Sequence, residues 1–388
     1  MSFHTQIVSS NWSFPTSVRF GNGRVSQLGA IARELGCNRP LVVTDNGLKD
    51  LYPVQRALKA LRGDGLEVAL FANVKPNPTG TNVADGVAAL RAGGHDLVVA
   101  IGGGSALDAA KAIALMARQT IPMWDLEDIG DNWTRADTSN LIPVIALPTT
   151  AGTGSELGRS SVITHEHEHR KVIVFHPRMM PDVVVMDPEL TTGLPPHITA
   201  ATGMDALSHA LEAYCAPSFH PMAEGVALNA LRLIAQWLPV ATLDGGNLEA
   251  RGQMLIASGM GCVALQKGLG AIHALAHPLG ALHDSPHGLL NAVLMPYVVE
   301  FNMPAIRDKL DFLGRFLDLP DASAAGVVTW IRTLRETLAI PETLTAMGLT
   351  DIDVDRVAAM GVVDPCAGGN PVPLDEQGLK RILRAAIG

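Results

Sequence analysis

The chain has 388 residues, of which 47% are hydrophobic and 17% are charged. This length and composition exclude a disordered protein and predict a chain of two globular domains. The net charge of −9 argues against nucleic acid or an anionic membrane surface as a partner.

The lack of a recognisable targeting signal and the spacing of the cysteines favour a cytoplasmic protein. The first ten residues, MSFHTQIVSS, lack the basic and apolar regions of a secretory signal. Apolar runs such as Leu97–Ile101 and Leu141–Leu147 are far too short to span a bilayer. The cysteines show no C-x-x-C spacing, as expected of free thiols in a reducing compartment. They are Cys37, Cys215, Cys262 and Cys366.

Short apolar runs alternate with helical patterns in the first half of the chain, which predicts parallel βαβ units. We expect strands at Ser17–Phe20, Arg39–Asp45, Glu67–Phe71, Asp96–Ile101, Leu141–Leu147 and Val183–Asp187. We expect helices at Pro53–Gly63, Val83–Ala92 and Ala106–Ala117. Two β-branched runs, Ser160–Thr164 and Lys171–Phe175, predict a hairpin.

Beyond residue 187 strand patterns nearly vanish and helical periodicity takes over. We expect helices at Ile198–Tyr214, Met222–Leu238, Leu248–Ala264, Gly288–Asn302, Val327–Leu338 and Leu379–Ala386. The sequence therefore predicts an α/β, Rossmann-like domain over residues 1–187 and an all-helical domain over residues 188–388.

Two small-residue loops follow predicted strands. The first, Gly102–Ser105, leads into a helix, whose N-terminal N–H groups can hold a phosphate. It does not match the G-x-G-x-x-G fingerprint, so this loop taken alone favours a plain tight turn over a phosphate site. The second loop, Thr149–Ser155, favours ligand binding, because open parallel sheets bind ligands at the carboxyl ends of their strands.

Two further motifs each have a structural interpretation as well as a functional one. Asp45 ends a strand and could bind the ribose hydroxyls of a nucleotide, or it could simply cap the Asp45–Gly47 turn. Residues 165–169, HEHEH, satisfy the H-E-x-x-H pattern of zinc proteases. That chemistry requires a helix, and these residues join two strand-like runs, so we reject it in favour of a hairpin tip.

Histidines gather in the stretch AIHALAHPLGALHDSPHG, residues 271–288. His273 and His277 are one helical turn apart, and Asp205 and His209 repeat this spacing upstream. Pro278 is expected to disturb the first helix, and Ser285-Pro286 to start the next. A carboxylate and several imidazoles could hold a divalent cation, although single histidines are often ordinary core residues.

In this order, the motifs resemble those of the iron-containing (group III) alcohol dehydrogenase family over nearly the whole chain. The matching motifs are PNPT, GGGSALDAAK, PTTAGTGSE, ATGMDALSHALEAY, HALAHPLGALHDSPHG and GGNPV. The resemblance implies a dinucleotide-binding α/β domain, a helical metal domain, and hydride transfer between NAD(H) and a metal-bound alcohol or aldehyde.

The resemblance also implies the site residues. The implied metal ligands are Asp205, His209, His273 and His287, with His277 on the proton path. The implied nucleotide contacts are Gly103, Gly104 and Ser105 for the pyrophosphate and Asp45, Asn77, Asp108, Thr149, Thr153 and Lys171 for the rest. Asp45 favours NAD(H) over NADP(H). The ion is Fe²⁺ in most members, but three imidazoles and one carboxylate suit Zn²⁺ equally well.

Two features concern the substrate and the reaction. The resemblance implies a small primary alcohol, diol or hydroxy acid as the substrate. Val372 stands where the family commonly has arginine, and Cys366 is expected near the substrate, so these two positions leave the particular substrate open. A lyase of the dehydroquinate-synthase type is disfavoured, because no Lys or Arg accompanies the ligand motifs. A dinucleotide-binding protein without turnover is also disfavoured, because it would not need the complete ligand set. Family members are commonly dimers or larger, and Ser17–Phe20 could pair across such an interface.

Overall fold

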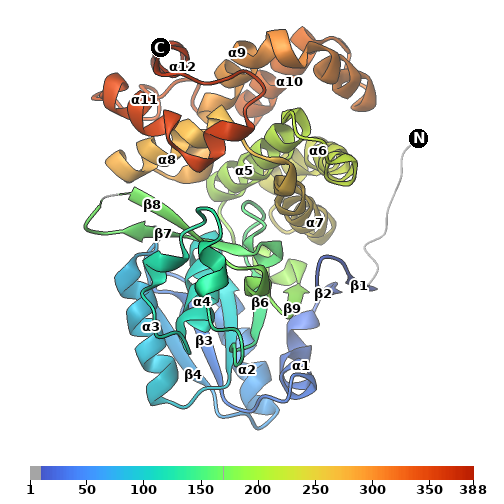
Figure 1. The fold of residues 1–388 in the computed structure, drawn as a ribbon. Coiled ribbons are helices and arrows are strands. Elements are labelled where there is room, and N and C mark those ends of the chain that lie inside the picture. Colours follow the sequence, from blue (N-terminus) through green and yellow to red (C-terminus); the bar gives the residue numbers. More distant parts are fainter. Residues whose placement is uncertain (1–9, 169) are drawn as a thin grey trace. The chain divides into compact units, whose positions relative to one another are not determined.

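The computed structural model describes residues 10–168 and 170–388, which form two compact units (Figure 1). The α/β unit comprises the chain up to Thr150 together with Gly154–Leu194 and Gly246–Leu255. The helical unit comprises Ala151–Thr153, Pro195–Gly245 and Ile256–Gly388.

A seven-stranded sheet forms the centre of the α/β unit. Its strand order is β1-β2-β9-β6-β5-β3-β4, and all neighbours are parallel except β1 and β2, which confirms the predicted βαβ units. The strands are β1 (Ser10–Ser13), β2 (Ser17–Phe20), β3 (Pro40–Asp45), β4 (Ala69–Val74), β5 (Leu97–Gly102), β6 (Val144–Pro148) and β9 (Val183–Met186). Every residue of β5 and β6 is buried, as expected of strands covered on both faces.

Helices cover the two faces of this sheet. They are α1 (Leu28–Glu34), α2 (Tyr52–Gly63), α3 (Gly80–Ala92) and α4 (Gly104–Met116). In α2 the buried residues Val54, Ala57, Leu58 and Leu61 recur at helical spacing and pack into one core with β3 and β5. Helix α4 is buried along nearly its whole length, because it is both apolar and central.

A separate antiparallel hairpin, β7 (Ser160–His165) and β8 (Arg170–Phe175), confirms the interpretation of residues 160–175. The HEHEH segment forms its tip and has no helix that could support a zinc-protease motif; its last residue, His169, lies outside the described residues. The hairpin packs on the PNPT turn, where the Thr164 N–H donates to the Pro78 carbonyl at 2.8 Å.

The expectation that Ser17–Phe20 pairs across a subunit interface is wrong. Strand β2 pairs on one side with β1 and on the other with β9, so both of its edges are used within the chain. The sequence pattern shows that a segment is a strand, but not which strands lie beside it.

The helical unit packs around α5, which is buried over most of its surface and contacts α6 and α9. Its helices are α5 (Pro196–Cys215), α6 (Pro221–Leu243), the second half of α7 (Leu248–Ala264), α8 (Ala271–His283), α9 (His287–Phe316), α10 (Ala324–Thr337), α11 (Val354–Val362) and α12 (Glu376–Ile387). Both α1 and α11 are short and were not predicted.

Prolines interrupt these helices less than their sequence suggests. Helix α8 continues through Pro278 to His283, and α9 continues through Pro296 and Pro304. An interior proline removes one hydrogen bond and costs about 3 kcal/mol, which dense packing along a buried helix can offset. At the start of α9, Pro286 is the N-cap rather than the first helical residue.

By length and composition alone, α6 and α9 could each cross a membrane, and α7 with α8 could form a third span broken by a bend of 107°. The apolar runs considered in the sequence are short by comparison. In the structure α6 and α9 pack against α5, and 44% and 61% of their most apolar windows are buried. Their apolar side chains thus contribute to the core of the helical unit.

Candidate metal centre and dinucleotide site

Three of the predicted ligands converge inside the helical unit. Asp205 comes from α5, His273 from α8 and His287 from the start of α9. Asp205 Oδ1 lies 3.9 Å from His273 Nε2 and 3.6 Å from His287 Nε2. Asp205 and His273 are almost fully buried. One potential ligand atom from each of the three residues lies within 4.8 Å of the others, which is the geometry of a metal-binding cluster.

Asn291 occupies the centre of this cluster. Its Nδ2 lies 2.7 Å from Asp205 Oδ1 and 3.2 Å from Nε2 of both His273 and His287. An amide nitrogen carries two protons, so it cannot donate to all three atoms at once. The three converging atoms would be satisfied better by a cation than by Asn291, and a divalent metal therefore fits this donor set.

His209, the fourth predicted ligand, stacks on His273 with 4.6 Å between ring centroids. It lies one helical turn from Asp205 but outside the close cluster of three. Burial lowers the pKa of His209 to about 4, so its imidazole is neutral and able to coordinate. Its Nδ1 is buried and has no hydrogen-bond partner among the described residues.

His277 faces the same cluster from α8 and has a carboxylate partner of its own. Its ring stacks on that of His287 with centroids 5.4 Å apart, and its Nδ1 lies 2.9 Å from Asp364 Oδ2. Although burial would raise the pKa of Asp364, the hydrogen bond and charge of His277 hold it below the usual range. Cys366 lies beside this pair, and burial raises the pKa of its thiol well above the ordinary value.

The sequence analysis assigned no role to several polar residues around this centre, although Glu212 and Asn370 lie within the motifs quoted above. Asn291 is one helical turn after His287, and Glu212 is three residues after His209, so helical spacing could have indicated both. Asp364 and Asn370 reach α8 from more than 80 residues away. No local pattern predicts such contacts.

The first glycine-rich loop leads from β5 into α4. Gly102 has φ of 149°, and a Cβ there would lie 2.7 Å from the Ala106 Cβ, so this position requires glycine. Gly103 is the N-cap of α4 and has no capping side chain. The first N–H groups of α4 thus lack helical acceptors, as an anion-binding helix start requires. Ser105 Oγ donates to the Pro76 carbonyl, next to Asn77.

Two residues of α4 attach the second loop to the first. Asp108 accepts hydrogen bonds from the Ser155 hydroxyl and, at 2.9 Å, from the Val162 N–H. Lys111 is buried and donates to the carbonyl oxygens of Ser155, Gly158 and Ser160. The carboxylate of Asp108, a predicted nucleotide contact, is therefore engaged by the protein and acts to hold the loop.

The other predicted nucleotide contacts lie at the following places. Asp45 Oδ1 accepts a hydrogen bond from the Leu48 N–H at 3.0 Å, which supports its interpretation as the cap of the turn. Asp45 Oδ2 lies near the first glycine-rich loop, because a Cβ on Gly102 would be 3.7 Å from it. Thr149 is buried, and its N–H donates to the Gly102 carbonyl at 2.9 Å. The remaining three are Asn77 in the turn after β4, Lys171 in β8 and Thr153 in the segment that belongs to the helical unit.

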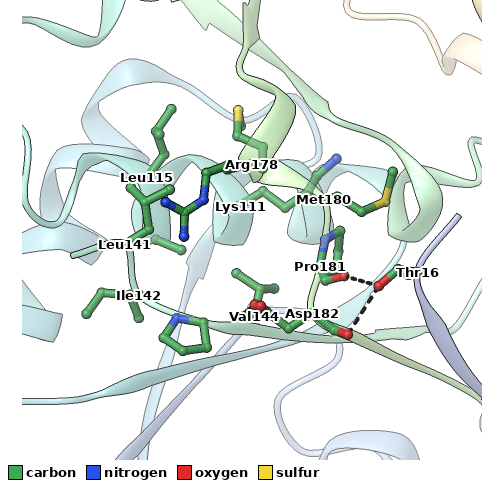
Figure 2. Close-up of a pocket in the computed structure, with 13 residues that line it drawn as sticks. Thr16, Lys111, Leu115, Leu141, Ile142, Val144, Arg178, Met180, Pro181 and Asp182 are labelled. Atoms are coloured by element: carbon green, nitrogen blue, oxygen red, sulfur yellow. Dashed lines mark hydrogen bonds between the residues drawn. The ribbon is translucent and has the colours of Figure 1, made fainter. Parts of the chain in front are cut away.

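A cavity of about 420 Å³ opens elsewhere in the α/β unit (Figure 2). It lies beside the amino end of β6, at Val144, and is lined by Thr16, Lys111, Arg178 and Asp182 among others. Thr16 Oγ1 donates to the carbonyls of Pro181 and Asp182 at its rim. No predicted nucleotide contact lines this cavity, so it is distinct from the two glycine-rich loops.

Two models of one protein family match the chain. The chain matches the model of the iron-containing alcohol dehydrogenase over residues 15–188 and that of the C-terminal part of the same family over residues 199–387. A 4-hydroxybutyrate dehydrogenase from Cupriavidus necator is 39% identical, with 96% of this chain and 98% of the relative covered.

Solved structures agree as well. A 1,3-propanediol oxidoreductase superposes with a TM-score of 0.90 at 37% identity, covering 95% of this chain and 97% of the other. A sulfoacetaldehyde reductase from Bifidobacterium kashiwanohense in complex with NAD⁺ gives a TM-score of 0.86 at 30% identity, covering 98% and 99%.

The α/β unit has a parallel sheet and a helix N-terminus of the kind that binds phosphate, and the helical unit has a buried cluster of histidines and a carboxylate. Together these features define a metal- and dinucleotide-dependent oxidoreductase. The chain belongs to the iron-containing alcohol dehydrogenase family. It is an NAD-dependent enzyme with one divalent metal, iron in this family, and it transfers hydride between an alcohol and NAD(H). The comparisons give no support to a lyase or a non-catalytic protein.

Glu156, directly after the second loop, makes folding stability depend on pH. Its carboxyl is fully buried, Oε1 has no hydrogen-bond partner among the described residues, and burial raises its pKa from 4.5 to about 7. Between these values the folded protein keeps a proton that the unfolded chain has lost, so stability falls as pH rises. We expect Glu156→Gln to raise the free energy of unfolding by up to about 3 kcal/mol at pH 8 and to change it little near pH 4.5.

Melting temperatures of the variant and the wild type from pH 4.5 to 8 test this expectation. The control is Glu67→Gln, which removes an exposed carboxylate from the same unit. If the Glu156 variant differs from the wild type by the same amount at every pH, the buried ionisable carboxyl is not the cause.

Proposed function

We propose that this enzyme interconverts short primary alcohols, diols or hydroxy acids and the matching aldehydes, with Asp205, His209, His273 and His287 as its metal ligands. The observation that carries the proposal is the convergence of Asp205 Oδ1 with two imidazole Nε2 atoms on a single amide nitrogen. When bound, the divalent metal supplies Lewis acidity, which lowers the pKa of an alcohol or polarises an aldehyde carbonyl.

In this proposal, His277 moves the proton. The carboxylate of Asp364 accepts from Nδ1, which leaves Nε2 free to take a proton from the alcohol or return it. The stacked position of His277 on His287 supports this role, because it lies next to the ligand cluster without belonging to it.

For the nucleotide, Gly103, Gly104 and Ser105 at the start of α4 would hold the pyrophosphate, since helix starts bind anions. The remaining proposed contacts are Asp45, Asn77, Thr149, Thr153 and Lys171, and Asp108 would contribute by holding the second loop. Asp45 would bind the ribose hydroxyls through the oxygen that does not serve the turn, which favours NAD(H). Accordingly, we assign residues 1–187 to nucleotide binding and 188–388 to the metal.

The cell compartment and assembly are also proposed. All four cysteines are free, as expected of a protein in the reducing cytoplasm. We propose a homodimer or larger assembly on the basis of the family resemblance, with β1 rather than β2 at the edge of the sheet.

Metal content and turnover test the function directly. After anaerobic purification we expect about one equivalent of Fe or Zn per chain, and NADH oxidation by a panel of short aldehydes that EDTA abolishes. Bound metal without turnover on any aldehyde would contradict the proposed substrate class. Absence of metal in a folded, NADH-binding protein would contradict the ligand assignment.

His273→Ala separates metal binding from nucleotide binding. Because His273 supplies one of the converging Nε2 atoms, the variant should lose its metal and its turnover, while NADH fluorescence still reports binding. The control is His283→Ala, which removes a histidine from the last position of α8 and should remain active. Full activity of His273→Ala after chelation would refute the assignment.

Asp45→Gly tests the choice of nucleotide. Removing a carboxylate that repels a 2′-phosphate should shift the ratio of kcat/KM for NADH and NADPH toward NADPH by at least about tenfold, or ~1.4 kcal/mol. Asp50→Gly, a change at a nearby exposed aspartate, should leave that ratio unchanged. An undiminished preference for NADH in the Asp45 variant would show that Asp45 serves only the turn.

A further inference from the structure

The first turn of α8 carries His273 and lacks a cap of its own. The N-cap residue, Gly270, has no side chain, so the N–H groups of Ala271 and Ile272 need acceptors from elsewhere. Two buried side chains provide them. Asn370 Oδ1 accepts from Ala271 at 3.1 Å, and Glu212 Oε1 accepts from Ile272 at 2.7 Å.

Glu212 also binds the imidazole of His273. Its second oxygen, Oε2, lies 2.6 Å from His273 Nδ1, and both side chains are almost fully buried. A carboxylate only accepts hydrogen bonds, so Nδ1 must carry the proton. In the neutral imidazole, the form that can coordinate a metal, the lone pair of His273 is then on Nε2, the nitrogen that faces Asp205 and Asn291.

Two glycines let the backbone lie close to the side chains of Glu212 and Asn370. A Cβ on Gly270 would lie 3.1 Å from Glu212 Oε1 and 2.8 Å from Asn370 Oδ1. A Cβ on Gly369 would lie 2.1 Å from the Leu269 carbonyl oxygen. The segment before α8 and the segment around Gly369 therefore approach each other closely only because positions 270 and 369 are glycine.

Asn370 in turn uses its whole hydrogen-bonding capacity. It exchanges two hydrogen bonds with Asn302 of α9, at 2.8 and 2.7 Å, and its Nδ2 also donates to the Val372 carbonyl at 2.7 Å. The GGNPV motif thus fixes the start of α8 from the C-terminal part of the chain.

We propose that Glu212 is a positioning residue of the metal centre, which sets the tautomer and orientation of His273 so that Nε2 can coordinate the metal. This inference rests on the proposed role of His273 as a ligand. Carboxylates that hydrogen-bond a coordinating histidine commonly contribute about 10- to 100-fold to metal affinity.

The test is Zn²⁺ affinity, measured in competition with a chromogenic chelator on wild type, Glu212→Gln and His273→Ala. A glutamine has one acceptor oxygen for two donors, so we expect Glu212→Gln to bind Zn²⁺ about 10- to 100-fold more weakly. The matched control is Glu224→Gln, which removes an ion-paired carboxylate on α6 and should bind Zn²⁺ like the wild type.

The two proposals fail in different ways. Unchanged affinity in His273→Ala would overturn the ligand assignment, whereas loss of affinity there with unchanged affinity in Glu212→Gln would overturn the role of Glu212 alone. A purely structural role would lower the melting temperature of Glu212→Gln without weakening Zn²⁺ binding by the folded protein, and this result would also overturn the inference.

A second measurement needs no variant at Glu212. Histidine ¹H–¹⁵N correlations of the Zn²⁺-loaded wild type, assigned with His273→Ala, reveal which ring nitrogen carries the proton. We expect a protonated Nδ1 on His273. A protonated Nε2 would overturn the proposal even if Glu212→Gln does not fold.

Discussion

The helical unit is constrained above all by the concentration of buried polar atoms around Asp205. Burying a polar group without a partner costs about 1–3 kcal/mol, and here a carboxylate and several imidazoles lie among apolar helices. Protein donors satisfy this cluster only partly, because Asn291 has two protons for three acceptors. A bound dication would resolve the deficit and so link the stability of this unit to its chemistry.

Close helix packing is what brings these atoms together. A Cβ on Gly288 would lie 2.4 Å from the carbonyl oxygen of Ala201, so α9 can begin against α5 only with glycine beside His287. A Cβ on Gly203 would likewise lie 2.1 Å from Leu238 of α6. Small residues on α5 and α9 therefore allow their polar neighbours to meet inside an otherwise apolar unit.

In the α/β unit the main constraint is different, because the backbone N–H groups of its loops must remain accessible to a ligand. Asp108 and Lys111 bind the hydroxyl and carbonyl groups of the second loop and so hold its shape through protein contacts. The N–H groups at the start of α4 remain without helical acceptors beside it. In both units, buried charged residues fix the loops and helix starts at which binding is proposed.

Periodicity and composition alone determined most of the elements, the α/β and helical halves, and the placement of His273 and His277 on one helix face. Local pattern could not predict the pairing of β2, the continuation of α8 through Pro278, or the partners Asp364 and Asn370. The reason is physical. Helical spacing acts over four residues, whereas the pairing of β2 with β9 and the carboxylate partners of His273 and His277 involve segments more than 60 residues apart, which only the tertiary structure brings into contact.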